Sequence, residues 1–81
     1  MMVKIVLFAS ARDIVGTDML ELSVDQAATV GDVRAELAQR HPELMDIMQC
    51  STWSVDHEYV DDTQPLHDAA EIGLIPPVSG G

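Results

Sequence analysis

The residues of this sequence best suited to chemistry are at its C-terminus. The chain ends in Pro76-Pro77-Val78-Ser79-Gly80-Gly81. A carboxylate carried on two residues without side chains can enter a narrow slot that a Cβ would block. Activated as an acyl-adenylate, that carboxylate could accept a nucleophile and carry it to another molecule. We therefore expect the terminus itself to react, and the alternative is a ragged end or a linker stub.

Two prolines give this tail a stiff base. Pro76 and Pro77 fix two successive φ angles, which lowers the entropy that the segment loses when it becomes ordered. We expect the chain to leave its last strand there as an extended arm. A stiff base and a slender tip suit a segment that reaches into the catalytic pocket of a neighbouring protein.

The other reactive side chains do not form a recognisable catalytic or metal site. His41, His57 and His67 are dispersed and lack ligand spacing with the single cysteine, so we expect no metal. Cys50 has no glycine or basic neighbour that would favour its thiolate, and we interpret it as a small structural residue. The pair Asp61-Asp62 is typical of a solvated loop. No glycine-rich nucleotide-binding motif is present.

Length, composition and charge define the class of protein. Eighty-one residues, 47% of them hydrophobic, form one domain near the lower size limit for an independent core. No apolar run has the length of a membrane span and no signal peptide is recognisable, so we expect a cytoplasmic protein. The net charge of −10 disfavours nucleic acid and membranes as partners and favours a basic protein surface. A general solubility bias or a salt-rich habitat would explain the same charge.

Two strands are expected before the first helix. Alternation of apolar residues predicts strands at residues 3–9 and 19–24 that pair as an antiparallel hairpin. Residues 10–14 between them form a connection longer than a tight turn. Gly16 supplies turn chemistry near the end of this connection.

The clearest helix signal begins after Thr29. This residue is a suitable N-cap, and Asp32 three residues later makes a short-armed capping box. Apolar residues at helical spacing follow until His41-Pro42, where the proline should end the helix. One more helical turn is expected at residues 43–48.

The rest of the chain returns to strands, and the order of elements predicts the fold. Short strands are expected at residues 53–55, 59–60 and 71–75. A hairpin, a helix and further strands suit an α+β fold of the β-grasp, or ubiquitin-like, type: a mixed sheet with one main helix packed on one face. The first and last strands should lie parallel at its centre. We assign residues 1–75 to this domain and 76–81 to a flexible tail.

Large apolar side chains could belong either to the core or to a docking surface. We expect Trp53 and the pair Met45 and Met48 in the core. Phe8, Tyr59 and Ile75 are equally compatible with the core and with an exposed patch on the sheet near the tail.

Three segments of the chain resemble a known family. They are Leu7-Phe8-Ala9-x-x-Arg12-Asp13-Ile14-Val15-Gly16, Thr29-Val30-x-x-Val33-x-x-x-Leu37 and Ile75-Pro76-Pro77-Val78-Ser79-Gly80-Gly81. Together they resemble the small subunit of molybdopterin synthase, a ubiquitin-like sulfur carrier. The resemblance spans essentially the whole chain, and the final segment is its most specific part.

This resemblance implies a role for the tail. An E1-like activating enzyme would use ATP to adenylate Gly81, which would then become a thiocarboxylate, with Gly80 keeping the approach open. The tail would deliver sulfur to cyclic pyranopterin monophosphate in the active site of the large subunit, within a heterotetramer. The chain itself would be a non-catalytic subunit with no cofactor of its own. Partner-binding residues would be Phe8, Tyr59 and Ile75 on a docking face, and Pro76, Pro77 and Val78 in the tail.

The sequence departs from the family pattern at two positions. Ala69 stands where the family usually has a glycine in a tight turn, which puts the local turn geometry in question. Asp56 replaces a frequent asparagine before a hairpin.

Three other functions stay open from the sequence. The chain could be the sulfur carrier for the thiazole of thiamine, although the Pro-Pro-Val before its tail argues against this. It could be a ubiquitin-like modifier joined through Gly81 to lysines of target proteins. It could also be a simple β-grasp binding module.

Overall fold

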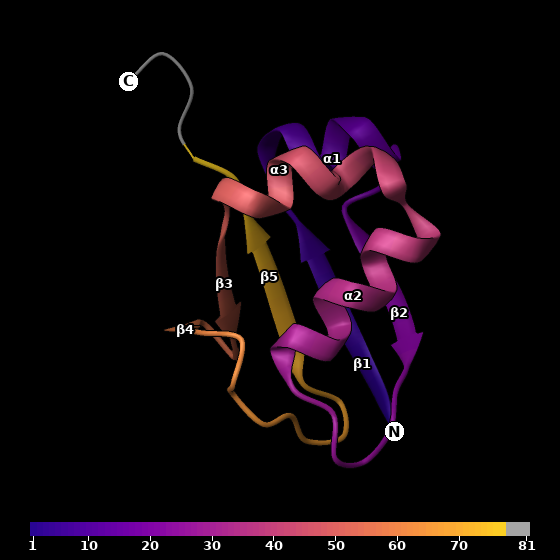
Figure 1. Ribbon diagram of the computed structural model, residues 1–81, viewed down its shortest axis with the longest axis vertical. Helices are drawn as coiled ribbons and strands as arrows, with labels where there is room; N and C mark the ends of the chain where they lie inside the picture. The colour runs from indigo at the N-terminus through magenta and orange to yellow at the C-terminus, as the bar shows by residue number, and fades with distance from the viewer. Residues whose placement is uncertain (78–81) are drawn as a thin grey trace.

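The structure, a computed structural model, describes residues 1–77 as one sheet with helices packed on one face and at one end (Figure 1). Five strands lie in the order β2-β1-β5-β3-β4. The strands are β1 (Met2–Leu7), β2 (Met19–Ser23), β3 (Thr52–Val55), β4 (Glu58–Val60) and β5 (Glu71–Ile75). The helices are α1 (Ala9–Val15), α2 (Val30–Arg40) and α3 (Met45–Cys50), and the 3₁₀ turn η1 (Pro42–Leu44) precedes α3.

The centre of the sheet pairs segments from opposite ends of the chain. Strands β1 and β5 run parallel, with Ile5 beside Ile72 and Leu7 beside Leu74. The pairs β1–β2, β3–β5 and β3–β4 are antiparallel. The sheet is therefore mixed, and the β-grasp fold predicted from the order of elements is confirmed.

Helix α2 begins and ends at the residues that the sequence indicates. The carboxylate of Asp32 accepts a hydrogen bond of 2.8 Å from the backbone N–H of Thr29, as part of a capping box. At the other end His41 leaves helical geometry, and Pro42 opens the turn η1. The further helical turn predicted at residues 43–48 is present as η1 and α3.

The connection between β1 and β2 is longer than a tight turn, as predicted, but it contains a helix that the sequence analysis did not predict. Residues 9–15 form helix α1, so the predicted strand at residues 3–9 was too long: β1 ends at Leu7, because Phe8 becomes the helix N-cap. Gly16 lies in a turn directly after this helix, as predicted. With φ of +90° it ends the helix, and its N–H donates to the carbonyl of Arg12 at 2.8 Å. A glycine that can end either a turn or a helix makes these two alternatives hard to separate from sequence.

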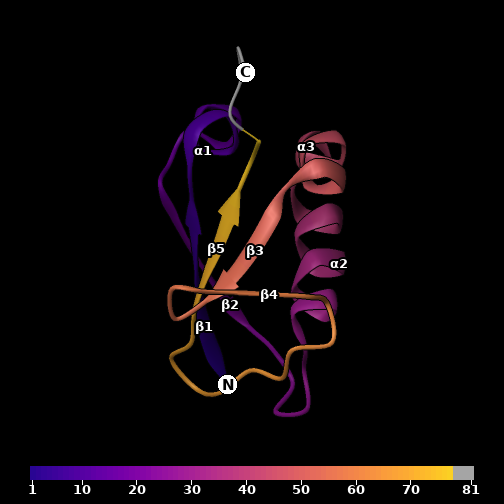
Figure 2. The ribbon, with the colours of Figure 1, turned by 90° about the vertical axis from the view of Figure 1, so that its left-hand side faces the viewer.

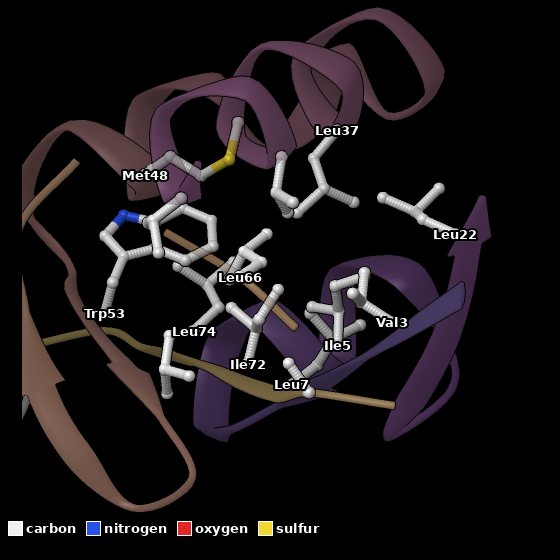
Figure 3. Packing of buried hydrophobic residues seen from close by; sticks show 14 of the residues in the cluster. Val3, Ile5, Leu7, Leu22, Leu37, Met48, Trp53, Leu66, Ile72 and Leu74 are labelled. Atoms are coloured by element: carbon white, nitrogen blue, oxygen red, sulfur yellow. The ribbon is translucent and has the colours of Figure 1, made fainter. Parts of the chain in front are cut away.

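The core lies between the sheet and α2, closed by residues from η1 and α3 (Figure 3). Trp53 is 3% exposed, which confirms its predicted place in the core. Met48 is also buried as predicted, but Met45 is 48% exposed on α3, so its assignment to the core was wrong. Cys50 is exposed at the end of α3. The fully buried strand residues are Val3, Ile5, Leu7, Ile72 and Leu74.

Candidate functional site

The sheet has one covered face and one open face. Helices α2 and α3 lie along one side, and the other side is left open below α1 (Figure 2). Side chains alternate along each strand, so every second residue belongs to the open face. A single row of such residues crosses all strands: Met19, Val6, Gly73, Ser54 and Tyr59.

Large apolar side chains border this row. Phe8, Met19 and Tyr59 are 45%, 45% and 76% exposed. Ile75 lies two residues beyond Gly73 on β5, so it belongs to the same face, and it is half-buried. We call this surface the apolar patch; it consists of Val6, Phe8, Met19, Gly73, Tyr59 and Ile75. Of the two alternatives that the sequence left open for Phe8 and Tyr59, the structure favours exposure.

Phe8 is held against β5 by its backbone and its ring. Its N–H donates to the carbonyl of Leu74 at 3.3 Å. Its Cε2 atom lies 3.5 Å from the point where a Cβ on Gly73 would stand. Tyr59 belongs to β4, two strands from β5, which at ordinary strand spacing is about 10 Å across the sheet. The patch therefore brings Phe8 and Ile75 together, with Tyr59 at its far edge.

Gly73 is the residue that makes this surface possible. A Cβ on Gly73 would clash with the hydroxyl oxygen of Ser54, the residue opposite Gly73 on β3. Both Gly73 and Ser54 are buried although they lie on the open face. Gly73, Val6 and Met19 were not predicted as site residues from the sequence. The signal that could have found them is alternation, since Val6 lies between the buried residues of β1.

The patch lies at the end of the sheet where the chain leaves it. Strand β5 ends at Ile75, and the end of the strand lies beside α1 (Figure 2). Pro76 is buried and Pro77 is exposed. Burial and the fixed φ of Pro76 set the point where the chain leaves the sheet. The other residues predicted for the tail, Val78, Gly80 and Gly81, lie outside the described residues.

The charge around the patch is mainly negative. Below the central row, Lys4 lies between Glu21 of β2 and Glu71 of β5. Arginine charges are compensated, because Arg12, Arg34 and Arg40 pair with carboxylates. The N···O distances are 3.9 Å for Arg12–Asp13, 2.9 Å for Arg34–Asp62 and 2.8 Å for Arg40–Glu36. With these cations already counted, the net charge of −10 would attract a basic partner.

Titratable groups gather at the turn between β3 and β4. His67 Nε2 lies 2.5 Å from Asp56 Oδ2. The hydrogen bond to Asp56 raises the pKa of His67, and the same bond lowers the pKa of Asp56. Both side chains are exposed. In the loop after β4, hydrogen bonds from Thr63 lower the pKa of Asp61, which agrees with a solvated loop.

The two departures from the family pattern lie near this turn. Ala69 has φ of +66°, the left-handed conformation in which glycine is favoured. Its backbone N–H donates to the carbonyl of Met2 at 2.8 Å, so the tight turn is kept and Ala69 is strained in it. The change therefore leaves the path of the chain intact.

Within residues 1–77, no three His, Cys, Asp or Glu side chains are grouped so that they could hold a metal ion. None of the helices in this part of the chain has the length and apolar character needed to cross a membrane.

Comparison with known proteins gives consistent matches over the whole chain. The model of the ThiS family matches residues 5–81. The molybdopterin synthase sulfur carrier subunit of Chlamydomonas reinhardtii is 31% identical, over 100% of both chains. The human protein of the same name is 34% identical, over 98% of this chain and 93% of its own length. The crystal structure of SAMP1, small archaeal modifier protein 1, from Haloferax volcanii superposes with a TM-score of 0.91 at 27% identity, covering 100% of both chains.

Proposed function

The chain belongs to the ThiS family, and we propose that it is the sulfur carrier subunit of a molybdopterin synthase. Relatives with that name match it along its full length. The observation that carries the proposal is the position of the apolar patch beside Pro76, where the chain leaves the sheet towards its terminal glycines. A surface for a partner thus lies next to Pro76, where the segment that carries the terminal glycines begins.

The proposed chemistry takes place on the carboxylate of Gly81. A carboxylate is a poor electrophile, so an E1-like adenylating enzyme would first join it to AMP from ATP, releasing pyrophosphate. A donor of sulfide-level sulfur would then form a C–S bond as the C–O bond to AMP breaks and AMP leaves. The product is a thiocarboxylate, a stronger nucleophile than the carboxylate, which stays covalently attached to the protein.

The proposed division of labour leaves catalysis to the partners. The apolar patch would dock on the large subunit of the synthase, and the tail would reach its active site, with Gly80 presenting no side chain to the channel. The sulfur would be transferred there to cyclic pyranopterin monophosphate, as a step in molybdenum cofactor biosynthesis. Between the apolar patch and this active site, the partner would contact Pro76, Pro77 and Val78. Two copies of each subunit would form the working heterotetramer, in the cytoplasm.

A second candidate function is protein modification through Gly81. The observation that favours it is the TM-score of 0.91 to a small archaeal modifier protein. The same activated terminus could be joined to a lysine amine instead of sulfur, because both nucleophiles displace AMP from the adenylate. The carrier for thiamine thiazole would use the same thiocarboxylate with a different partner.

The decisive experiment is intact mass spectrometry of the protein isolated from its native cell. We expect a fraction heavier by one oxygen-to-sulfur exchange, localised to Gly81 by fragmentation. Deletion of Gly81, or addition of one residue after it, should remove this fraction and abolish rescue of a cofactor-deficient cell. Rescue of molybdoenzyme activity by either variant would refute the proposal.

Two further measurements separate the candidates. Copurification with a large synthase subunit supports the molybdopterin pathway over the thiamine pathway. Conjugates that persist in a denaturing gel, with Gly81 linked to lysine in tryptic peptides, would instead establish a modifier.

A further inference from the structure

The hairpin between β3 and β4 turns through two residues with positive φ. Asp56 and His57 have φ of +50° and +73°. Two-residue turns of this kind favour Asn-Gly and Asp-Gly, so Asp56 suits the first position, whereas His57 stands at the second, where glycine would have no Cβ to oppose the geometry. The turn therefore depends on contacts from outside the hairpin.

Those contacts come from the first residue of β5. The backbone N–H of Asp56 donates to the carbonyl of Glu71 at 2.8 Å, and the N–H of Glu71 donates to Asp56 Oδ1 at 3.1 Å. The side chain of His57 makes a second contact, in which its Nε2 lies 3.1 Å from Glu71 Oε2. Lys4 is the register partner of Glu71 on β1, the strand on the other side of β5 from β3.

His67 makes a third contact with the turn, and the positions of its two ring nitrogens specify its protonation state. Its Nε2 lies 2.5 Å from Asp56 Oδ2, and its Nδ1 lies 2.8 Å from the backbone carbonyl oxygen of Asp68. Both of these oxygens are acceptors. A neutral imidazole has one N–H and can donate to only one of them, whereas the imidazolium ion donates to both. The arrangement is therefore complete only when His67 is protonated.

We propose that His67 is a proton-operated clasp that fixes the β3–β4 turn, and with it the Tyr59 edge of the apolar patch. Protonated, His67 joins Asp56 in the turn to the loop before β5. Deprotonation removes one of its two hydrogen bonds and the attraction between the charges. Strand β4 has three residues and pairs only with β3 among the described strands, so it is the element that this loss loosens.

The direction of the switch follows from the charged groups around His67. Asp56 and Asp68 both favour the imidazolium, and the pKa of His67 is raised above its usual 6.5. The clasp is therefore closed below about pH 6.5 and opens as the pH rises through the raised pKa. A partner that docks on the Tyr59 edge of the apolar patch should bind more tightly when the clasp is closed. This consequence rests on the proposed function. The clasp itself is a property of this chain alone.

The test is amide hydrogen exchange of the isolated protein, followed by NMR between pH 5 and 9. Protection factors, which correct for the intrinsic pH dependence of exchange, are compared for Glu58, Tyr59 and Val60. We expect protection to fall through the titration of His67, by about tenfold for each unit by which its pKa is raised. Protection of the buried amides of β1 should not change over this range.

Three variants make the result specific. In His67→Gln and Asp56→Asn, β4 should have low protection at every pH, with no titration step. Asp56→Asn keeps the side-chain oxygen that accepts from Glu71, but it removes the charge and replaces the oxygen that faces His67 with an NH2 group, so it separates the clasp from the turn. His41→Gln is the matched control, because His41 lies 3.8 Å from Glu43 far from this turn and should leave the step unchanged. A constant protection factor in the wild type, or a step that survives in His67→Gln, would overturn the proposal; neither result bears on whether Gly81 carries sulfur.

Discussion

The two faces of strand β5 show how five residues serve two purposes. Ile72 and Leu74 point to the covered face, where both are fully buried under the helices. Gly73 and Ile75 point to the open face, where Gly73 makes room for the Ser54 hydroxyl and Ile75 is part of the apolar patch. The same backbone therefore stabilises the domain on one side and presents a surface on the other.

The difference between the faces is chemical as well as geometric. The core cluster on the covered face consists of apolar side chains. The open face combines exposed Phe8 and Tyr59 with a border that contains Lys4 and Glu71. An exposed apolar area with a polar rim is typical of a protein–protein interface. Because the two properties lie on different faces, mutations should change stability and partner binding separately.

The largest effect is expected from a cavity on the covered face. Leu74→Ala removes a fully buried side chain, which should lower the free energy of unfolding by about 2–5 kcal/mol. Urea unfolding followed by Trp53 fluorescence measures it. Ile75→Ala, one residue further on the same strand, is the control and should cost less than half as much. Equal losses would mean that the two faces do not differ in their contribution to stability.

A smaller loss is expected where the open face is most tightly packed. Gly73→Ala puts a Cβ onto the Ser54 hydroxyl and against the Phe8 ring, which should cost about 1–3 kcal/mol of unfolding free energy. The reason can be tested directly, because Ser54→Ala removes the clashing oxygen. A double-mutant cycle measured by urea unfolding should therefore show that Gly73→Ala costs less unfolding free energy in the Ser54→Ala background than in the wild type. An additive double mutant would contradict this explanation.

Much of the fold could be predicted from the sequence because its signals are local and periodic. Helix α2 has a capping box, apolar spacing and Pro42 at its end, and all three point to the same boundaries. Helix α1 has seven residues and one fully buried side chain, Ala11, so it has little periodicity to detect. Tertiary packing of Ala11 decides what the local sequence leaves ambiguous.

The candidate site was predictable only in part, because it depends on strand register. Phe8, Tyr59 and Ile75 were assigned to a docking face through the family resemblance. The role of Gly73 required the structure, since only the pairing of β5 with β3 places it opposite Ser54. Nothing in the sequence around either residue indicates that they meet.

A substitution on the open face should weaken partner binding with little change in the stability of the domain. Phe8→Ala removes an exposed aromatic ring beside the tail and should weaken binding to a purified large synthase subunit by about 10-fold or more, while the unfolding free energy changes by less than about 1 kcal/mol. Calorimetric titration measures the affinity. Met45→Ala is the matched control: Met45 is 48% exposed, close to the 45% of Phe8, but lies on α3. Equal effects of the two substitutions would place the docking surface elsewhere.

A gain in stability is expected at the strained turn before β5. Ala69→Gly relieves a side chain held at φ of +66°, which should raise the free energy of unfolding by about 1 kcal/mol. Ala70→Gly, at the neighbouring buried position, should lower it instead. Urea unfolding of the two variants gives the sign directly. A destabilised Ala69→Gly protein would show that the left-handed conformation is not under strain.

The smallest effect is expected from the Asp56–His67 pair, because both side chains are exposed to water. The pKa of His67 is raised from 6.5, so its contribution to stability is complete below about pH 6.5 and is lost as the pH rises through the raised value. The pKa of Asp56 is lowered from 3.8, so its contribution is present above about pH 3.8 and is lost as the pH falls through the lowered value. The free energy of unfolding of the wild type should therefore exceed that of Asp56→Asn most clearly between about pH 3.8 and pH 6.5. The difference should shrink towards pH 8. Unfolding free energies of the two proteins at pH 5, 6, 7 and 8 test this, and a difference that is constant or grows with pH would show that the pair does not titrate as a unit.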